Sequence, residues 1–180
     1  MSARAVARFD AAVEERVDRV RRRVSGLDRV MYVASELGDF SLVWHLVSTA
    51  RAIAPDRRLA HAVRVAALLG AESALVNGPV KALFRRHRPA WEQDRPLRLR
   101  RPRTSSFPSG HASAALTAAG LLSERDRLWP LYYAIAAVVA SSRVYVKIHH
   151  PSDVVAGALI GAALARAGRL AWPFPPVDGK

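Results

Sequence analysis

A short polar stretch, Pro-Ser-Gly-His, comes directly before a run of small apolar residues between Thr104 and Leu116. A proline and a serine at this place are typical of a turn that leads into a helix, with Ser109 as the capping residue. The same arrangement also suits a phosphate group, because the unpaired N–H groups at a helix start bind anions and His111 stands beside them. The stretch therefore allows two interpretations, a helix cap or a phosphate site.

A group of cations precedes this stretch, at the end of an apolar segment. Pro89 ends the helix that carries them, so they gather in its last turns: Lys81, Arg85, Arg86 and Arg88. The helix dipole favours cations at that end, and a solvated basic helix end explains the group when it is taken alone.

The stretch SSRVYVKIHHPSD forms the third group, in which Arg143 precedes two histidines and an aspartate. Pro151 is a natural first residue of a helix, which places Asp153 in the first turn. From there its carboxylate can reach back to a histidine, orient it and leave the other ring nitrogen for nucleophilic attack. A helix cap with incidental histidines explains the stretch in isolation, and the residues alone do not distinguish His149 from His150.

Together the three groups contain the parts that metal-free phosphoryl transfer needs. Cations are available for the phosphoryl oxygens, one histidine for the nucleophile, a carboxylate to orient it, and a second histidine to protonate the leaving group. Three histidines and one aspartate among arginines would repel a divalent cation, so we expect no metal site and no cofactor.

The elements that position these groups are predicted to be helices, and we expect an all-α fold. Five apolar segments are rich in Ala, Leu, Val and Gly, and none alternates polar and apolar residues as a strand does. Residues 3–24 repeat apolar side chains at helical spacing between Arg and Glu, which predicts an amphipathic helix on a core or on a membrane surface. The apolar segments cover residues 38–54, 59–80, 110–123, 128–142 and 153–170.

The apolar segments carry conflicting signs of membrane insertion. A span needs ~20 mostly apolar residues, and the charge-free stretches are shorter, while Arg64 and Glu72 interrupt the second segment. A small-xxx-small pattern from Gly157 to Gly161, however, suits close helix packing in a bilayer. Aromatic residues lie at segment ends, as in interfacial belts. We therefore expect a membrane-embedded bundle of about five spans plus the N-terminal amphipathic helix.

The composition limits the classes of partner. The net charge of the 180 residues is +13 and comes almost wholly from arginine. Such a charge suits nucleic acid, anionic lipid headgroups or phosphorylated substrates. No nucleic-acid-binding motif is present and the cations belong to the groups above, so we do not expect nucleic acid as a partner. The chain has no cysteine, and no cleavable signal peptide is expected, since the N-terminus lacks an apolar region.

The three groups resemble the three-part signature of the type 2 phosphatidic acid phosphatase (PAP2) superfamily, which includes lipid phosphatases, bacterial acid phosphatases and vanadium haloperoxidases. The matching residues occur in the family's order and spacing, within about residues 59–165: Lys81-x6-Arg88-Pro89, Pro108-Ser109-Gly110-His111 and Ser142-Arg143-x5-His149-x3-Asp153.

The resemblance implies a role for each matching residue. His149 would form a phosphohistidine intermediate, Asp153 would orient it, and His111 would protonate the leaving oxygen. His150 is excluded by the spacing of the motif. The remaining residues would bind the phosphoryl oxygens: Lys81, Arg88, Arg143, Ser109 and the Gly110 N–H.

The resemblance also implies a substrate. A short, arginine-rich member whose site faces inward, as the charge distribution described next predicts, is similar to the actinobacterial branch that dephosphorylates decaprenylphosphoryl-5-phosphoribose. We therefore expect a lipid phosphate as the partner. The expected substrate is a phosphomonoester of a polyprenyl-linked compound. The alternatives are a phosphatase of polyprenyl diphosphate, phosphatidate or phosphatidylglycerophosphate, and a soluble acid phosphatase. The sequence indicates neither the headgroup and chain length nor the oligomeric state.

The distribution of cations predicts the side of the membrane. If residues 38–54 form the first span, eight arginines before Val30 and nine Lys or Arg from Lys81 to Arg103 share one face, against two in each opposite loop. The positive-inside rule then places that face, with the active site, in the cytoplasm of a multi-pass inner-membrane protein.

Residues 20–37 contain six charged side chains, which make a further span unfavourable there. We expect this segment to lie on the membrane surface, attracted by anionic lipid. The expected domains are accordingly an interfacial helix, residues 1–30, and a phosphatase domain, residues 31–175.

Overall fold

The computed structural model describes residues 2–24, 26–53, 58–100, 102–124 and 126–174. Three of the arginines counted for the charge distribution lie outside the described residues: Arg57, Arg101 and Arg125. The predicted end of the first apolar segment, residue 54, and the predicted end of the phosphatase domain, residue 175, also lie outside them. Within the described residues the chain is all-α, as predicted, with seven helices: α1 (Ala3–Arg23), α2 (Leu27–Leu37), α3 (Leu42–Ala52), α4 (Arg58–Leu75), α5 (Gly110–Leu122), α6 (Trp129–Tyr145) and α7 (Pro151–Ala171). A turn of 3-10 helix (Asp39–Ser41) precedes α3, and a π-helical turn (Val76–Val80) extends α4.

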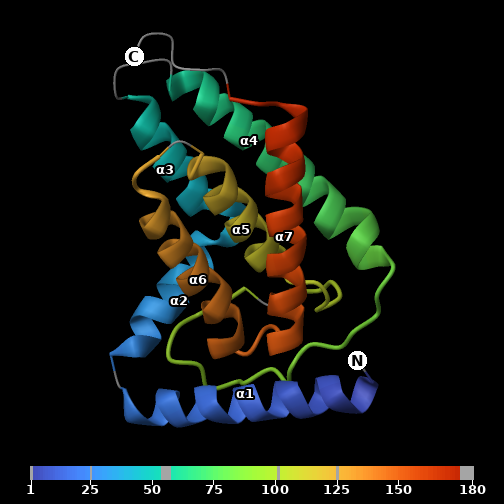
Figure 1. Ribbon diagram of the computed structural model, residues 1–180. Coiled ribbons are helices and arrows are strands. Elements are labelled where there is room, and N and C mark those ends of the chain that lie inside the picture. Colours follow the sequence, from blue (N-terminus) through green and yellow to red (C-terminus); the bar gives the residue numbers. More distant parts are fainter. Residues whose placement is uncertain (1, 25, 54–57, 101, 125, 175–180) are drawn as a thin grey trace.

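The helices form a bundle with one helix laid across its end. α1 covers that end, and α2 and α3 follow one another away from it (Figure 1). The first turns of α5 and α7 and the last turn of α6 lie at the end that α1 covers, and the long loop after α4 runs over the same end (Figure 1). The three sequence motifs, which belong to these turns and this loop, therefore meet there.

α5 lies against α7 along most of its length because the residues between them are small. Gly157 and Gly161 of α7 allow a very close approach: a Cβ at Gly161 would lie 2.2 Å from the carbonyl oxygen of Ser113. Thr117 Oγ1 donates a hydrogen bond to the Gly161 carbonyl at 3.1 Å. The small-xxx-small pattern thus faces α5 and holds the second and third motifs side by side.

The outer face of the bundle carries many large apolar side chains that are exposed, among them Leu46, Val63, Leu131, Val155 and Leu159. By length and composition, two helical stretches within the described residues could cross a membrane, Leu59–Val80 and Pro151–Ala171. α5 has 13 residues and α6 has 17, so the expectation of about five spans stays a prediction for the shorter helices.

The expectation that residues 20–37 form one surface segment is wrong for α2. α1 ends at Arg23, and α2, which begins at Leu27, turns into the bundle. Tyr32 of α2 is 1% exposed there and packs against Tyr145 of α6. Asp28 accepts a hydrogen bond from the Tyr145 hydroxyl at 2.9 Å, so the bundle accommodates this charge. The domain boundary at residue 30 stays a prediction, although it falls inside α2.

Candidate active site

His149 lies in the short loop between α6 and α7, where it is 2% exposed. Its Nδ1 lies 3.6 Å from Oδ2 of Asp153, and its Nε2 lies 3.2 Å from Nη1 of Arg88. Burial, together with Arg88 and Arg143, lowers the pKa of His149 to about 3. The imidazole is therefore neutral near pH 7 and can act as a nucleophile.

His150 has different surroundings although it is the next residue. Its Nδ1 lies 2.8 Å from Oε1 of Glu14 in α1, on the outer side of the loop. Only His149 of this pair faces the cations of the first motif, through Arg88. The geometry thus favours His149 over His150, a choice that the residue types alone had left open.

The start of α5 is joined to the start of α7. The Ser109 N–H donates to the Asp153 carbonyl at 3.0 Å, and Ser109 Oγ caps α5 by accepting from the Ala112 N–H at 3.4 Å. His111 Nε2 lies 2.7 Å from Oδ1 of Asp39, in the turn before α3. Sequence reasoning missed Asp39, because no local pattern connects two residues that are 72 positions apart.

Three cations converge from different elements. Arg88 Nη1 donates to the Ile148 carbonyl at 3.0 Å, and Arg143 Nη1 donates to the Ser35 carbonyl at 3.1 Å. Burial, and then the neighbouring Arg88 and Arg143, lower the pKa of Lys81 to about 8, so Lys81 is still mostly charged at pH 7. Cations held together in this way favour a multiply charged anion among them.

One cavity of about 740 Å³ collects these groups. Six of the eight predicted site residues line it: Lys81, Arg88, Gly110, His111, Arg143 and His149. The other two, Ser109 and Asp153, are buried and bonded to each other next to it. The rest of the lining includes a polar group: Asp39, Glu72, Ser73 and Asn77. The structure therefore brings all the predicted residues together, while the chemical role of each stays a prediction.

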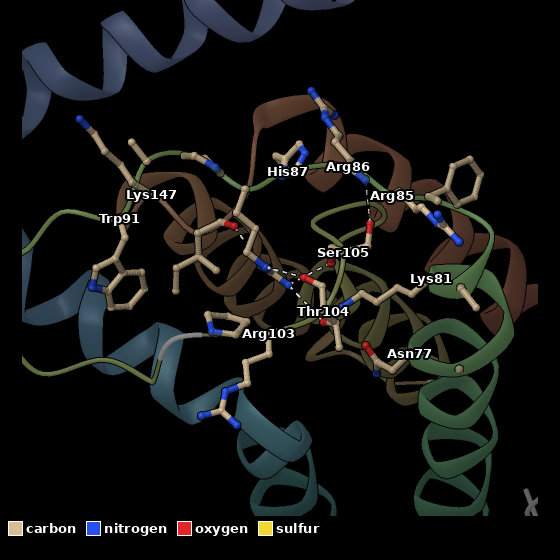
Figure 2. Close-up of a pocket in the computed structure, with 18 residues that line it drawn as sticks. Asn77, Lys81, Arg85, Arg86, His87, Trp91, Arg103, Thr104, Ser105 and Lys147 are labelled. Atoms are coloured by element: carbon tan, nitrogen blue, oxygen red, sulfur yellow. Dashed lines mark hydrogen bonds between the residues drawn. The ribbon is translucent and has the colours of Figure 1, made fainter.

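A second cavity, also about 740 Å³, adjoins the first (Figure 2) and shares six lining residues with it: Asn77, Lys81, Arg88, Pro102, Arg103 and Thr104. Its lining is strongly basic and includes Arg85, Arg86, His87, Arg103 and Lys147. Within the described part of the chain, no group of three or more His, Asp or Glu side chains is placed to hold a metal ion.

Arg86 is a further residue at the site to which the sequence assigned no role. Its Nη1 donates to Oδ1 of Asp153 at 2.6 Å, and its Nη2 donates to Oδ2 of Asp10 at 2.6 Å. It belongs to the basic group before Pro89, but nothing in the sequence separates it from the other arginines there.

A family model described as the PAP2 superfamily matches residues 61–174. The chain is 35% identical over 134 residues to decaprenylphosphoryl-5-phosphoribose phosphatase of Mycobacterium tuberculosis, an alignment that covers 72% of each chain. Its fold is similar to that of LpxE from Aquifex aeolicus, with a TM-score of 0.72 and 25% identity over 90% of this chain and 94% of the other. A transmembrane PAP2-type phosphatidylglycerolphosphate phosphatase from Bacillus subtilis also has a similar fold, with a TM-score of 0.72 and 24% identity over 93% and 86% of the two chains.

Proposed function

The chain belongs to the PAP2 superfamily of metal-independent phosphatases, and from this premise we propose that it removes the phosphomonoester from a polyprenyl-linked lipid such as decaprenylphosphoryl-5-phosphoribose. One observation carries the catalytic part of the proposal. A buried, neutral imidazole at His149 faces one cavity together with three cations and a second histidine. The relative from M. tuberculosis supports the substrate class.

The first chemical step forms a bond between phosphorus and Nε2 of His149. The bond between phosphorus and the leaving oxygen breaks, and that oxygen takes a proton from the His111 imidazolium, which Asp39 stabilises from 2.7 Å. Asp153 stabilises the positive charge that develops on the imidazole, 3.6 Å away. The three cations bind the phosphoryl oxygens, whose charge they balance throughout.

The second step returns the enzyme to its starting state. Water attacks the phosphohistidine, and His111, which lost its proton in the first step, takes one from the water. The bond from phosphorus to His149 breaks, inorganic phosphate is released, and the imidazole is neutral again. Because the same histidine serves as acid and then as base, no further proton donor is needed.

The polar lining of the cavity supports a hydroxyl-bearing leaving group. Glu72 lies in a stretch long and apolar enough to cross a membrane, yet it is 3% exposed and lines the cavity. Its Oε1 has no hydrogen-bond partner among the described residues. An ionisable residue buried in a span is costly and is usually functional. Glu72, with Ser73 and Asn77 beside it, therefore suits the hydroxyl groups of a sugar better than an acyl or prenyl chain.

We expect the purified protein to release phosphate from decaprenylphosphoryl-5-phosphoribose in the presence of EDTA. Its kcat/KM for this lipid should exceed the values for undecaprenyl diphosphate, phosphatidate and phosphatidylglycerophosphate by about 10-fold or more, since buried polar groups reject substrates that leave them unpaired. Phosphate release with each lipid in mixed micelles measures this. A preference for the diphosphate would replace the proposed substrate, and a requirement for an added divalent ion would contradict the mechanism.

Glu72→Gln is the matched variant for the substrate assignment. It keeps the shape of the side chain and replaces one acceptor oxygen with an amide donor, so kcat/KM for the sugar phosphate should fall by about 10-fold while that for a simple alkyl phosphate changes little. An equal loss for both substrates would instead make Glu72 a partner of the nearby Lys81.

The active site, on this proposal, faces the cytoplasm of the inner membrane. α1, with its many arginines, lies at the same end of the bundle as the catalytic loop, which supports the single-face distribution of charge (Figure 1). The cation-rich face of a membrane protein is retained in the cytoplasm.

Single cysteines test this orientation, because the chain has no cysteine of its own. Ser2→Cys and Gln93→Cys mark the catalytic end, and Arg127→Cys marks the loop between α5 and α6 at the opposite end. A membrane-impermeant maleimide should label only position 127 in intact cells and all three positions in permeabilised cells. Labelling of position 93 in intact cells would place the active site outside.

A further inference from the structure

We propose that α1 is a positioning element of the active site, and that Asp10 acts through Arg86 on the contact between Asp153 and His149. The proposal rests on the phosphatase chemistry given above, but it does not depend on which lipid is the substrate.

Arg86 joins α1 to the catalytic carboxylate. Nη1 donates to Asp153 at 2.6 Å and to Ser152 Oγ at 2.7 Å, and Nη2 donates to Asp10 at 2.6 Å. Asp10 also accepts from the Ser152 N–H and from Ser152 Oγ, each at 2.8 Å, one residue before Asp153. Asp10 is 4% exposed and Asp153 is fully buried, whereas the Arg86 side chain between them is 29% exposed. The two carboxylates are therefore shielded from solvent, and the arginine that joins them is partly accessible.

Three of the four carboxylates of α1 occur at every fourth residue and face the catalytic end of the bundle. After Asp10, Glu14 contacts Nδ1 of His150 at 2.8 Å, and Asp18 contacts Nζ of Lys147 at 2.9 Å. In Figure 2 the side chains of Arg86 and Lys147 extend toward the dark blue helix along the top of the view, which is α1. α1 is thus bonded to both loops that carry catalytic groups, and of these three carboxylates only Asp10 contacts Arg86, which in turn contacts Asp153.

Arg86 and His149 face different oxygens of the same carboxylate. Arg86 Nη1 donates to Oδ1 of Asp153 at 2.6 Å. Oδ2 accepts from the His150 N–H at 2.9 Å and lies 3.6 Å from Nδ1 of His149, which exceeds the length of a normal hydrogen bond. Asp10 holds the other terminal nitrogen of Arg86 and so fixes the guanidinium that positions Oδ1. The position of the carboxylate behind the nucleophile therefore depends on a contact with α1.

The test is a double-mutant cycle with p-nitrophenyl phosphate, a substrate that reads the catalytic centre without the lipid. We expect Arg86→Gln to lower kcat by about 10- to 100-fold with little change in KM, because the phosphate-binding cations are intact while Asp153 loses its fixed position. Asp10→Asn should lower kcat by about 3- to 10-fold, because Arg86 loses its charged partner in α1 and holds Asp153 less firmly. If Asp10 acts through Arg86, the double variant is no slower than Arg86→Gln alone.

Two control variants separate positioning from simple docking of α1. Glu14→Gln and Asp18→Asn break comparable contacts of α1 and should leave kcat within about 2-fold of the wild type, even where they lower the thermal midpoint in detergent. Arg86→Lys, which keeps the charge, should recover part of the loss. The proposal would be overturned by equal losses of kcat in the three α1 variants Asp10→Asn, Glu14→Gln and Asp18→Asn. It would also be overturned if the loss in the double variant equalled the product of the two single losses. If the wild type hydrolyses p-nitrophenyl phosphate but not the polyprenyl-linked lipid, the proposed substrate is wrong. The double-mutant cycle would still test whether Asp10 acts through Arg86.

Discussion

His149→Ala should abolish turnover, with kcat lowered by about 10⁴-fold or more. Removing the nucleophile of a covalent mechanism eliminates the intermediate. The residual rate then comes only from the lysine and arginine side chains that bind the phosphate. Phosphate release measures the loss. A quench with base after mixing with ³²P-labelled substrate should trap labelled phosphohistidine in the wild type and none in the variant.

His150→Ala is the matched control, because it removes the neighbouring imidazole and its contact with Glu14. We expect turnover within a few-fold of the wild type and normal trapping of the phosphoenzyme. The reverse result, with activity retained in His149→Ala and lost in His150→Ala, would move the nucleophile by one residue.

Gly157→Ala should lower both activity and stability, although Gly157 does not line the active-site cavity. A Cβ at this position would lie 2.3 Å from the carbonyl oxygen of Ser109 and 3.3 Å from the Cβ of Ala112. α5 and α7 must therefore move apart near their first turns. α5 carries the phosphate-binding Ser109 and Gly110 at this point, and α7 carries Asp153, the carboxylate behind the nucleophile. Displacements of about 1 Å cost up to about 100-fold in rate, and overpacking costs about 1–3 kcal/mol of stability. Phosphate release and thermal unfolding in detergent measure the two effects.

Gly70→Ala provides the comparison for a glycine inside a helix. Nothing lies within 4 Å of a Cβ at Gly70 in α4, so the variant should keep full activity and gain up to about 1 kcal/mol of stability from its better helix propensity. Unchanged kinetics in Gly157→Ala would show that the spacing between α5 and α7 does not set the geometry of the site.

Much of the fold could be predicted because its signals are local. The absence of alternating segments predicted an all-α chain, and the segment expected at residues 110–123 is observed as Gly110–Leu122. Pro151 was expected to begin a helix and does so. Helix periodicity, caps and prolines act within a few residues, so they are present in the sequence itself. The prediction failed at residues 84–88, which were expected in the last turns of a helix ended by Pro89 and lie instead in the loop after that helix. It also failed at residues 20–37, where Tyr32 of α2 packs against Tyr145 of α6.

The residue types and spacing of the three motifs also determined which groups would form the site, and the structure brings these groups into one region. Only the tertiary structure decided their partners. It turned His150 toward Glu14 and left His149 facing Arg88, placed Asp39 against His111, and separated Arg86 from the neighbouring arginines by bonding it to Asp153 and Asp10. These contacts join residues far apart in the chain. They exist because close packing of α5 on α7, and of α1 across the end of the bundle, fixes which side chains meet. No local pattern in the sequence specifies these contacts.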